Sequence, residues 1–149
     1  FPIGASVALG EAADLFQPGD HATTFGGNPV TSAAAVAVLD TIDSEAILEH
    51  VHQVGDYLAD QVADLNHPGI VAVRGAGLLR AIELSEPIAA EVNQLAMAKG
   101  FLVNAVSPSA IRIAPPLVIT EQELDTFVAA LPGILDEAIA RLASQESKE

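Results

Sequence analysis

Apolar residues recur at spacings of three and four through the middle of the chain, which predicts a long amphipathic helix. The recurring positions are Ile47, Val51, Val54, Leu58, Val62 and Leu65. Asp43 or Ser44 can accept hydrogen bonds from the free N–H groups at its start, and Asn66-His67-Pro68-Gly69 ends it. Acidic residues between the apolar positions place the opposite face of this helix in water.

Shorter aliphatic runs predict two pairs of strands. Ile70–Arg74 and Leu78–Leu84 flank Gly75-Ala76-Gly77, a pattern typical of two strands that meet at a glycine turn. Phe101–Val106 and Ile111–Ala114 are predicted as a second, shorter pair. The four strands together indicate one small sheet.

Two further helices are predicted around these strands. The first ends at Gly100, where a glycine suits a left-handed C-cap. The second begins with Thr120 and Glu123 at the spacing of a capping box. Pro132 is expected to kink or interrupt this helix, because proline lacks the N–H group and clashes with the preceding turn. The polar residues 144–149 are expected to fray.

The first part of the chain follows a different pattern. Phe1–Leu9 is apolar and is interpreted as a strand or extended segment, Glu11–Phe16 as a brief helix and Gln17–Asp20 as a turn. Pro29–Leu39 consists almost entirely of small apolar residues and is expected to form a helix in a core. These elements have no evident partners in the sequence that follows.

Two domains are therefore predicted. Residues 1–42 are expected to be the incomplete end of a larger domain whose other part lies upstream. Residues 43–149 contain, in order, a helix, two strands, a helix, two strands and a helix. This order indicates an α+β domain in which helices pack on one small sheet.

The composition restricts the partners of the chain. Twenty acidic residues outnumber six basic ones, and no Lys or Arg precedes Arg74. Nucleic acid is excluded as a partner and an anionic membrane surface is disfavoured, because binding to either needs clustered cations. No apolar run reaches membrane-spanning length. The absence of cysteine excludes disulfides and a thiol nucleophile and is compatible with a cytoplasmic location. His50 and His52 point to different helix faces, so no metal site is predicted.

The segment His21–Pro29 combines several features of a binding loop. Thr23 and Thr24 precede Gly26-Gly27, and Asn28-Pro29 is typical of a helix start. Hydroxyl groups and a glycine-opened backbone at a helix N-terminus suit an anion, above all a phosphate. From the residues alone, a plain Gly-Gly turn is an equal alternative.

Arg112 stands alone in the apolar strand predicted over Ile111–Ala114. Its planar guanidinium can hold a carboxylate with two parallel hydrogen bonds, and strand alternation turns it away from its apolar neighbours. Ordinary pairing with one of the many acids is an equal alternative. Arg74 and Arg80 are expected to pair with surface acids, and Lys99 to lie at a helix C-terminus.

Three motifs occur in the order and rough spacing of one enzyme family. They are Phe1-Pro2-Ile3-Gly4-Ala5, Thr23-Thr24-Phe25-Gly26-Gly27-Asn28-Pro29, and Arg112 with Pro115-Pro116-Leu117. On these motifs the chain resembles the class III pyridoxal-phosphate-dependent aminotransferases over essentially its whole length. Within that class, Val73–Leu79 with Ile82-Glu83-Leu84, and Val103–Val106, look most like acetylornithine aminotransferases.

The resemblance implies a fold, a cofactor and a set of site residues. The fold would be the C-terminal small domain of a fold-type I aminotransferase, preceded by the tail of the large α/β domain that binds pyridoxal 5′-phosphate. Thr24 matches the threonine that binds the cofactor phosphate of the neighbouring subunit in a homodimer. Thr23 matches a position that touches substrate, and Arg112 matches the arginine that grips the substrate α-carboxylate. The family commonly has glycine where this chain has Ala22.

The resemblance also implies that no catalytic residue lies in this chain. In the family, the lysine that binds the cofactor as a Schiff base lies just upstream of the segment that begins at Phe1, and neither Lys99 nor Lys148 is expected to replace it. The chain is expected to be part of an enzyme that transfers an amino group between N-acetylornithine and 2-oxoglutarate in arginine biosynthesis. By itself it is expected to be inactive and to hold no cofactor.

Two alternatives stay open at this point. Ornithine, succinylornithine or 4-aminobutyrate could be the amino donor of the same kind of enzyme. A stand-alone, non-catalytic α+β binding or regulatory domain is the second hypothesis.

Overall fold

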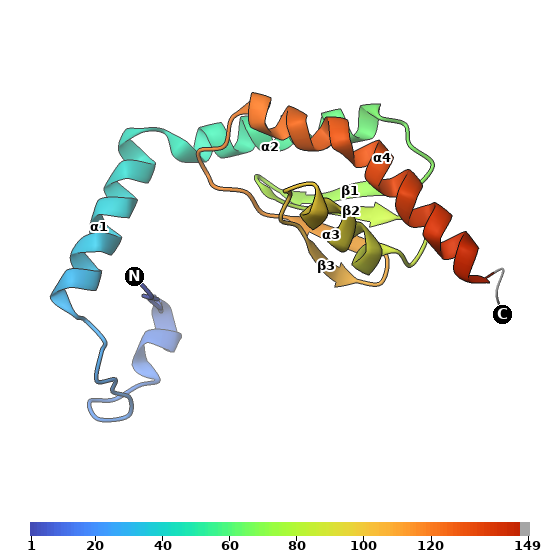
Figure 1. Cartoon of the computed structure of the whole chain (residues 1–149). Coiled ribbons are helices and arrows are strands. Elements are labelled where there is room, and N and C mark those ends of the chain that lie inside the picture. Colours follow the sequence, from blue (N-terminus) through green and yellow to red (C-terminus); the bar gives the residue numbers. More distant parts are fainter. Residues whose placement is uncertain (147–149) are drawn as a thin grey trace. The chain divides into compact units, whose positions relative to one another are not determined.

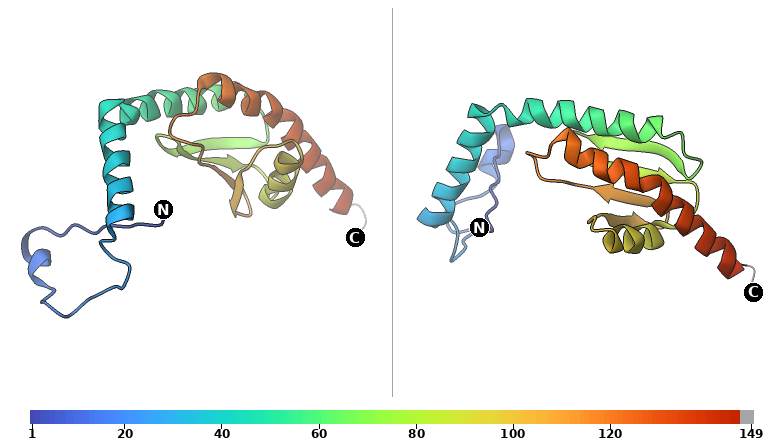
Figure 2. Two further views of the ribbon diagram at one scale, coloured as in Figure 1. Left: turned by 60° about the vertical axis from the view of Figure 1, so that its left-hand side comes forward. Right: turned by 45° about the horizontal axis from the view of Figure 1, so that its top comes forward.

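A computed structural model describes residues 1–146 of the chain. The structure separates into two compact units, which divide between Ala46 and Ile47 and are described one at a time. Figures 1 and 2 show the helices and strands of both units.

The first unit contains a 3₁₀ helix, η1 (Gly10–Asp14), and one α-helix, α1 (Pro29–Ser44). η1 overlaps the predicted brief helix, and the predicted turn is confirmed by the N–H of Asp20, which donates to the carbonyl of Gln17 at 3.0 Å. Residues 1–9 form no strand, so of the two interpretations of this segment the strand is wrong and the extended segment stays. A strand needs a hydrogen-bonded neighbour, and the sheet of the described residues is built from later segments.

The end of α1 differs from the prediction. Asp43 and Ser44 lie in its last turn, so neither caps the next helix, α2 (Ile47–Asp64), and the predicted cap is wrong. The break comes instead from the backbone of Ala46, whose φ of 51° is left-handed and cannot continue a helix. No residue of α1 is buried, so the described chain does not give this helix the core position expected from its small residues.

The second unit is built on a four-stranded antiparallel sheet. Its strands are β1 (Ile70–Ala76), β2 (Leu79–Leu84), β3 (Asn104–Ser107) and β4 (Ala110–Ile113), in the order β1-β2-β4-β3. β1 and β2 meet at the predicted glycine turn, and β3 and β4 form the second predicted pair. The two hairpins join through β2 and β4, which makes one sheet of all four strands.

Helices α2, α3 (Ala89–Ala98) and α4 (Glu121–Glu146) pack on this sheet and on one another (Figure 1). The predicted apolar stripe of α2 is confirmed, because Val54, Leu58 and Val62 are buried. The core formed by the sheet and helices includes Leu84, Val92, Leu95, Leu124, Phe127, Leu131 and Leu135.

The helices cover only one face of the sheet. Ile82 of β2 and Ile111 of β4 pair with each other and are fully buried. Ala81 and Arg112 pair one position further along and are more accessible, so they lie on the opposite face. This opposite face, called the open face below, carries the candidate arginine.

α4 runs through Pro132 as one helix, so of the predicted kink or interruption the interruption is wrong. Proline inside a helix costs about 3 kcal/mol, through the lost hydrogen bond and the steric clash. Leu131, Ile134 and Leu135 beside it are fully buried, and burying each such side chain contributes about 1.5–3 kcal/mol. Packing of this helix on the core therefore outweighs the local cost.

The predicted helix ends are partly confirmed. The backbone N–H of Thr120 donates to Oε2 of Glu123 at 2.9 Å, and the N–H of Glu123 donates to Oγ1 of Thr120 at 3.3 Å, which is a capping box. Gly100 follows α3 with a φ of 88°. Residues 144–146 continue α4 and do not fray as expected, while residues 147–149 lie outside the described part.

Candidate functional site

Asn28 fixes the point at which the loop His21–Pro29 passes into α1. Its Oδ1 accepts hydrogen bonds from the N–H groups of Val30 at 2.9 Å and Thr31 at 3.3 Å, and Pro29 opens the helix. The predicted helix start is confirmed. Asn28 already satisfies these N–H groups, and the threonine hydroxyls are among the neutral donors that the loop keeps for an anion.

Thr23 and Thr24 carry those hydroxyls, and neither hydroxyl makes a hydrogen bond to the described part of the chain, residues 1–144. Thr23 lines a hollow of about 610 Å³ together with the segment Pro2–Ala5 and the start of α1, whereas Thr24 is not one of its lining residues. A Cβ on Gly26 would come within 2.3 Å of Cγ2 of Thr23. Glycine at position 26 therefore leaves room for Thr23 in its observed place.

The loop fits a phosphate through neutral donors and not through charge. The first unit contains no Lys or Arg, because the first basic residue of the chain is Arg74. Two adjacent free hydroxyls and the left-handed backbone of Gly27, with a φ of 67°, give a phosphate hydrogen-bond donors and close access. The negative charge of the phosphate must be balanced by groups outside this unit.

Arg112 lies in β4 and projects from the open face of the sheet. It is exposed, whereas Ile111 and Ile113 on either side are buried, so the predicted alternation is confirmed. Its Nη2 donates to Oδ1 of Asn104, which is its partner in the β3–β4 register, at 3.3 Å.

Arg112 differs from the other arginines of the chain in its partners. The other three form ion pairs, namely Arg74 with Glu83, Arg80 with Asp56, and Arg141 with Glu91 and Glu137. The pairing predicted for Arg74 and Arg80 is thus confirmed. Among the side chains described, those of residues 1–144, the partner of Arg112 is a neutral amide, although the chain has twenty acidic residues. Its positive charge therefore stays available to a carboxylate ligand.

The model of the family described as class III aminotransferase matches residues 1–135 of the chain. The chain belongs to the class III aminotransferases. Acetylornithine aminotransferase of Streptomyces coelicolor is 53% identical over 137 residues, which are 92% of this chain and 34% of that protein. Acetylornithine aminotransferase of Mycobacterium leprae is 48% identical over 144 residues, 97% of this chain and 36% of that protein.

Solved aminotransferases share the fold of this class III chain. Acetylornithine aminotransferase from Elizabethkingia anophelis superposes with a TM-score of 0.76 and 34% identity, over 85% of this chain and 34% of that one. Ornithine delta-aminotransferase of Plasmodium falciparum superposes with a TM-score of 0.75 and 26% identity, over 84% of this chain and 33% of that one. The predicted aminotransferase fold is confirmed, and the chain spans about a third of the length of these relatives.

Class III aminotransferases depend on pyridoxal 5′-phosphate. The donor set of the Thr23-Thr24 loop fits the phosphate of that cofactor, and Arg112 fits a substrate carboxylate. The two threonines belong to the first unit of this aminotransferase chain and Arg112 to the second. Lys99 is exposed at the end of α3, and Lys148 lies outside the described residues.

Arg80 has a structural role that its sequence context only partly indicates. It is 9% exposed, and its Nε and Nη1 donate to the carbonyl groups of Gly77 at 2.8 Å and Gly75 at 3.1 Å. Its Nη2 donates to Oδ1 of Asp56 on α2 at 2.7 Å. The sequence gives one indication of this role. Strand alternation turns Arg80 toward the core, and a buried cation must be paired. In this aminotransferase domain, Arg80 ties the β1–β2 turn to α2.

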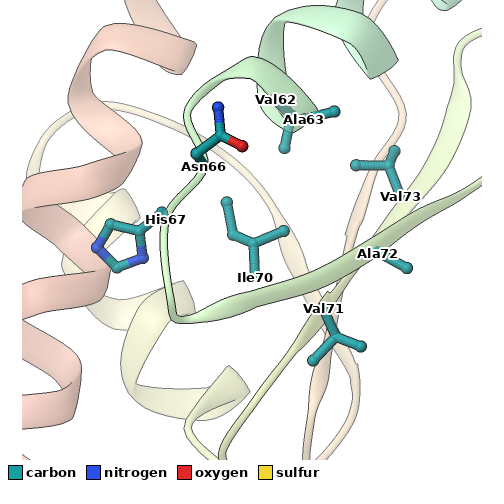
Figure 3. Close-up of a pocket in the computed structure, with 8 residues that line it drawn as sticks. All are labelled: Val62, Ala63, Asn66, His67, Ile70, Val71, Ala72 and Val73. Carbon is teal, nitrogen blue, oxygen red and sulfur yellow. The ribbon is translucent and has the colours of Figure 1, made fainter.

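A hollow lies where α2 passes into β1 (Figure 3). His67, at its rim, accepts a hydrogen bond at Nδ1 from the N–H of Gly69 at 3.0 Å, so the ring proton is assigned to Nε2, which faces Oδ1 of Asp136 on α4 at 3.1 Å. The other side chains drawn in Figure 3 are aliphatic apart from Asn66. Both ring nitrogens are engaged, so His67 links β1 to α4 and offers no free base.

Among the side chains of residues 1–144, no group of three or more His, Cys, Asp or Glu is placed to hold a metal ion. None of the helices described within residues 1–146 has both the length and the apolar composition of a membrane span.

Proposed function

We propose that this chain supplies the C-terminal part of a homodimeric, cytoplasmic enzyme that transfers an amino group between N-acetylornithine and 2-oxoglutarate in arginine biosynthesis. The names of the relatives that match nearly all of the chain support the substrate assignment. The observation that carries the site is the unneutralised charge of Arg112 on the open face of the sheet. A guanidinium held in this way is suited to an α-carboxylate, which every substrate of the reaction carries.

In this proposal each site residue has a separate task. Arg112 binds the substrate α-carboxylate and thereby orients the substrate, while Asn104 holds one end of the guanidinium. Thr24 donates its hydroxyl to the cofactor phosphate in the site of the partner subunit, and Thr23 contacts the substrate there. Pyridoxal 5′-phosphate, when bound, would supply the electron sink for proton removal at the substrate carbon that carries the reacting amino group.

The 149-residue chain alone is proposed to have no aminotransferase activity and to retain no cofactor. The reaction requires a lysine that holds the cofactor and moves the proton of the carbon bearing the reacting amino group, and the family resemblance places that lysine before Phe1. Lys99 is exposed at the end of α3, outside the segments that resemble the cofactor site. Measurable turnover by the isolated chain, or a cofactor retained after dialysis, would contradict this part of the proposal.

The substrate assignment is tested with the full-length enzyme. We expect kcat/KM to be higher for N-acetylornithine than for ornithine, succinylornithine or 4-aminobutyrate, with 2-oxoglutarate as acceptor. A preference for one of the other amines would transfer the assignment to that amine. Absence of transfer from all four would reject the proposed function.

The role of Arg112 is tested by substitution in the same enzyme. Arg112→Gln is expected to lower kcat/KM by about 10- to 100-fold, because a hydrogen bond to a charged group contributes about 1.5–3 kcal/mol. Arg141→Gln is the matched control, since Arg141 pairs with Glu91 and Glu137 on the helices. Equal kinetics of the Arg112 and Arg141 variants would remove Arg112 from the site.

A further inference from the structure

β1 forms one edge of the sheet, because it is the first strand in the order β1-β2-β4-β3. In an antiparallel ladder every second residue turns its N–H and C=O groups away from the neighbouring strand. Outside the ladder with β2, the backbone of Val71–Arg74 makes no hydrogen bond within residues 1–146. The outer edge of β1 therefore presents donors and acceptors that a further strand can use.

The hollow between α2 and β1 lies along this free edge (Figure 3). Its volume is about 360 Å³, and its lining includes four consecutive strand residues, Ile70–Val73, together with Val62 and Ala63 of α2. Consecutive residues of a strand face opposite sides of the sheet, so a hollow lined by all four lies at the edge and not on one face. A groove between an edge strand and a helix has the shape of one extended peptide.

The edge beside the hollow carries an apolar side chain without cover. The β1–β2 register shifts between Ile70 and Ala72, which leaves Val71 without a partner residue on β2. Val71 is 65% exposed. On the helix side Ala63 is exposed and small, so it leaves the hollow open. An aliphatic side chain of an added strand would find contacts here that the described chain does not supply.

The charges around the hollow are negative. Asp60 and Asp64 lie exposed in the last two turns of α2, and Asp136 of α4, which contacts His67 at the rim, is 74% exposed. The chain has no Lys or Arg before Arg74. A cationic segment is therefore attracted to this rim, whereas a second copy of the chain, with a formal net charge of −14, would bring the same acids against it.

We propose that the outer edge of β1 and the end of α2 bind an extended, cationic segment of another protein, which joins the sheet as a fifth strand. The backbone of the segment pairs with the free edge, at the spacing of about 4.8 Å that separates neighbouring strands. Its aliphatic side chains cover Val71 and enter the hollow, and its Lys or Arg side chains meet the aspartates of the rim. The proposal does not depend on the proposed function, because Arg112 lies on the open face and not at this edge.

The test uses the full-length enzyme and three short peptides with blocked ends. The first alternates valine and lysine, the second alternates valine and glutamate, and the third is the first with methyl groups on its backbone nitrogens. Fluorescence anisotropy is expected to show that the first binds at least about tenfold more tightly than the others, which lack either the charge attraction or the backbone donors. Amide hydrogen exchange of β1 should slow on binding of the first peptide.

Ala63→Leu is expected to weaken binding of the valine–lysine peptide by about tenfold, because the larger side chain fills the hollow. Gln53→Leu is the matched control, since Gln53 is exposed on the same helix and does not line the hollow. If Ala63→Leu does not fold, the double variant Asp60→Asn with Asp64→Asn provides the test. It keeps the shape of the hollow and should weaken binding most at low salt.

Several results would overturn the proposal. Failure of the valine–lysine peptide to bind would show that another part of the enzyme covers the edge. Equal binding of the methylated peptide, or slowed exchange elsewhere than in β1, would show attraction by surface charge alone. Equal affinities of the Ala63→Leu and Gln53→Leu variants would place the peptide outside the hollow. Self-association of the enzyme that Ala63→Leu abolishes would assign the edge to a second copy instead.

Discussion

Arg112 donates an N–H of its guanidinium to the amide oxygen of Asn104 across the β3–β4 ladder, at 3.3 Å. An amide oxygen accepts the same hydrogen bond as a carboxylate oxygen but brings no charge. The contact therefore orients the arginine without neutralising it. Aspartate at position 104 would keep the shape of the side chain and add a competing negative charge.

Asn104→Asp is expected to raise KM for 2-oxoglutarate by about tenfold, because a new ion pair with Arg112 must be displaced by its α-carboxylate. Asn104→Ala should change KM less, since it removes the orienting contact but adds no competitor. Steady-state kinetics of the full-length enzyme measure both variants. Wild-type KM values in Asn104→Asp would show that Asn104 does not act on the ligand group.

Thr24→Val is expected to lower the affinity of the dimeric enzyme for pyridoxal 5′-phosphate by about tenfold, through loss of one hydrogen bond to a charged group. Equilibrium dialysis followed by reconstitution measures the dissociation constant. Thr24→Ser keeps the hydroxyl and should retain wild-type affinity. Thr23→Val should change substrate KM and not cofactor affinity, so an equal loss of cofactor in both valine variants would contradict the division of roles between the two threonines.

Gly55 of α2 lies against the turn between β1 and β2. A Cβ at position 55 would come within 2.2 Å of the carbonyl oxygen of Gly77, which also accepts a 2.8 Å hydrogen bond from Arg80. Gly55→Ala is therefore expected to destabilise the protein by about 1–3 kcal/mol, because the forced shift of the backbone exceeds the gain of about 1 kcal/mol in helix propensity.

The matched control for Gly55→Ala is Gly133→Ala in α4. A Cβ at position 133 would meet no atom within 4 Å, so alanine is expected to stabilise the helix by about 0.5–1 kcal/mol. Denaturant unfolding compares the two variants. An increase in stability from both would show that the α2 contact with the turn is loose.

Tyr57 donates its hydroxyl to Oδ1 of Asp125 at 2.6 Å, and this hydrogen bond, with smaller contributions from burial and nearby negative charge, raises the pKa of Tyr57 from 10.0 to about 12. A pKa that is higher in the folded state stabilises the protein fully below the unfolded value and is lost as pH rises through the folded value. The stability difference between wild type and Tyr57→Phe should therefore be constant below pH 10 and shrink between pH 10 and about 12. Thermal unfolding across that range measures it; a constant difference up to pH 12 would refute the assignment.

The predictions that held depend on residues within one or two turns of each other. The cap at Asn28, the capping box of Thr120 with Glu123, and the apolar stripe of α2 each follow from local spacing, and all three are present. The predictions that failed depend on distant packing. Pro132 does not interrupt α4, although a kink stays untested, because buried neighbours hold the helix, and residues 1–9 form no strand, although they can be extended, because no partner strand pairs with them.

The candidate site shows the same division between what local sequence predicts and what tertiary packing decides. The sequence is enough to identify Thr23, Thr24 and Arg112, because each lies in a continuous motif. It also predicts that Arg112 faces away from its buried neighbours, because strand alternation has a period of two. Only the folded sheet decides that Arg112 pairs with an amide instead of an acid and that Arg74, Ala81 and Asn104 share its row across the four strands. The register between strands separated by helix α3 is set by how their apolar faces pack against the helices, and no local pattern specifies that register.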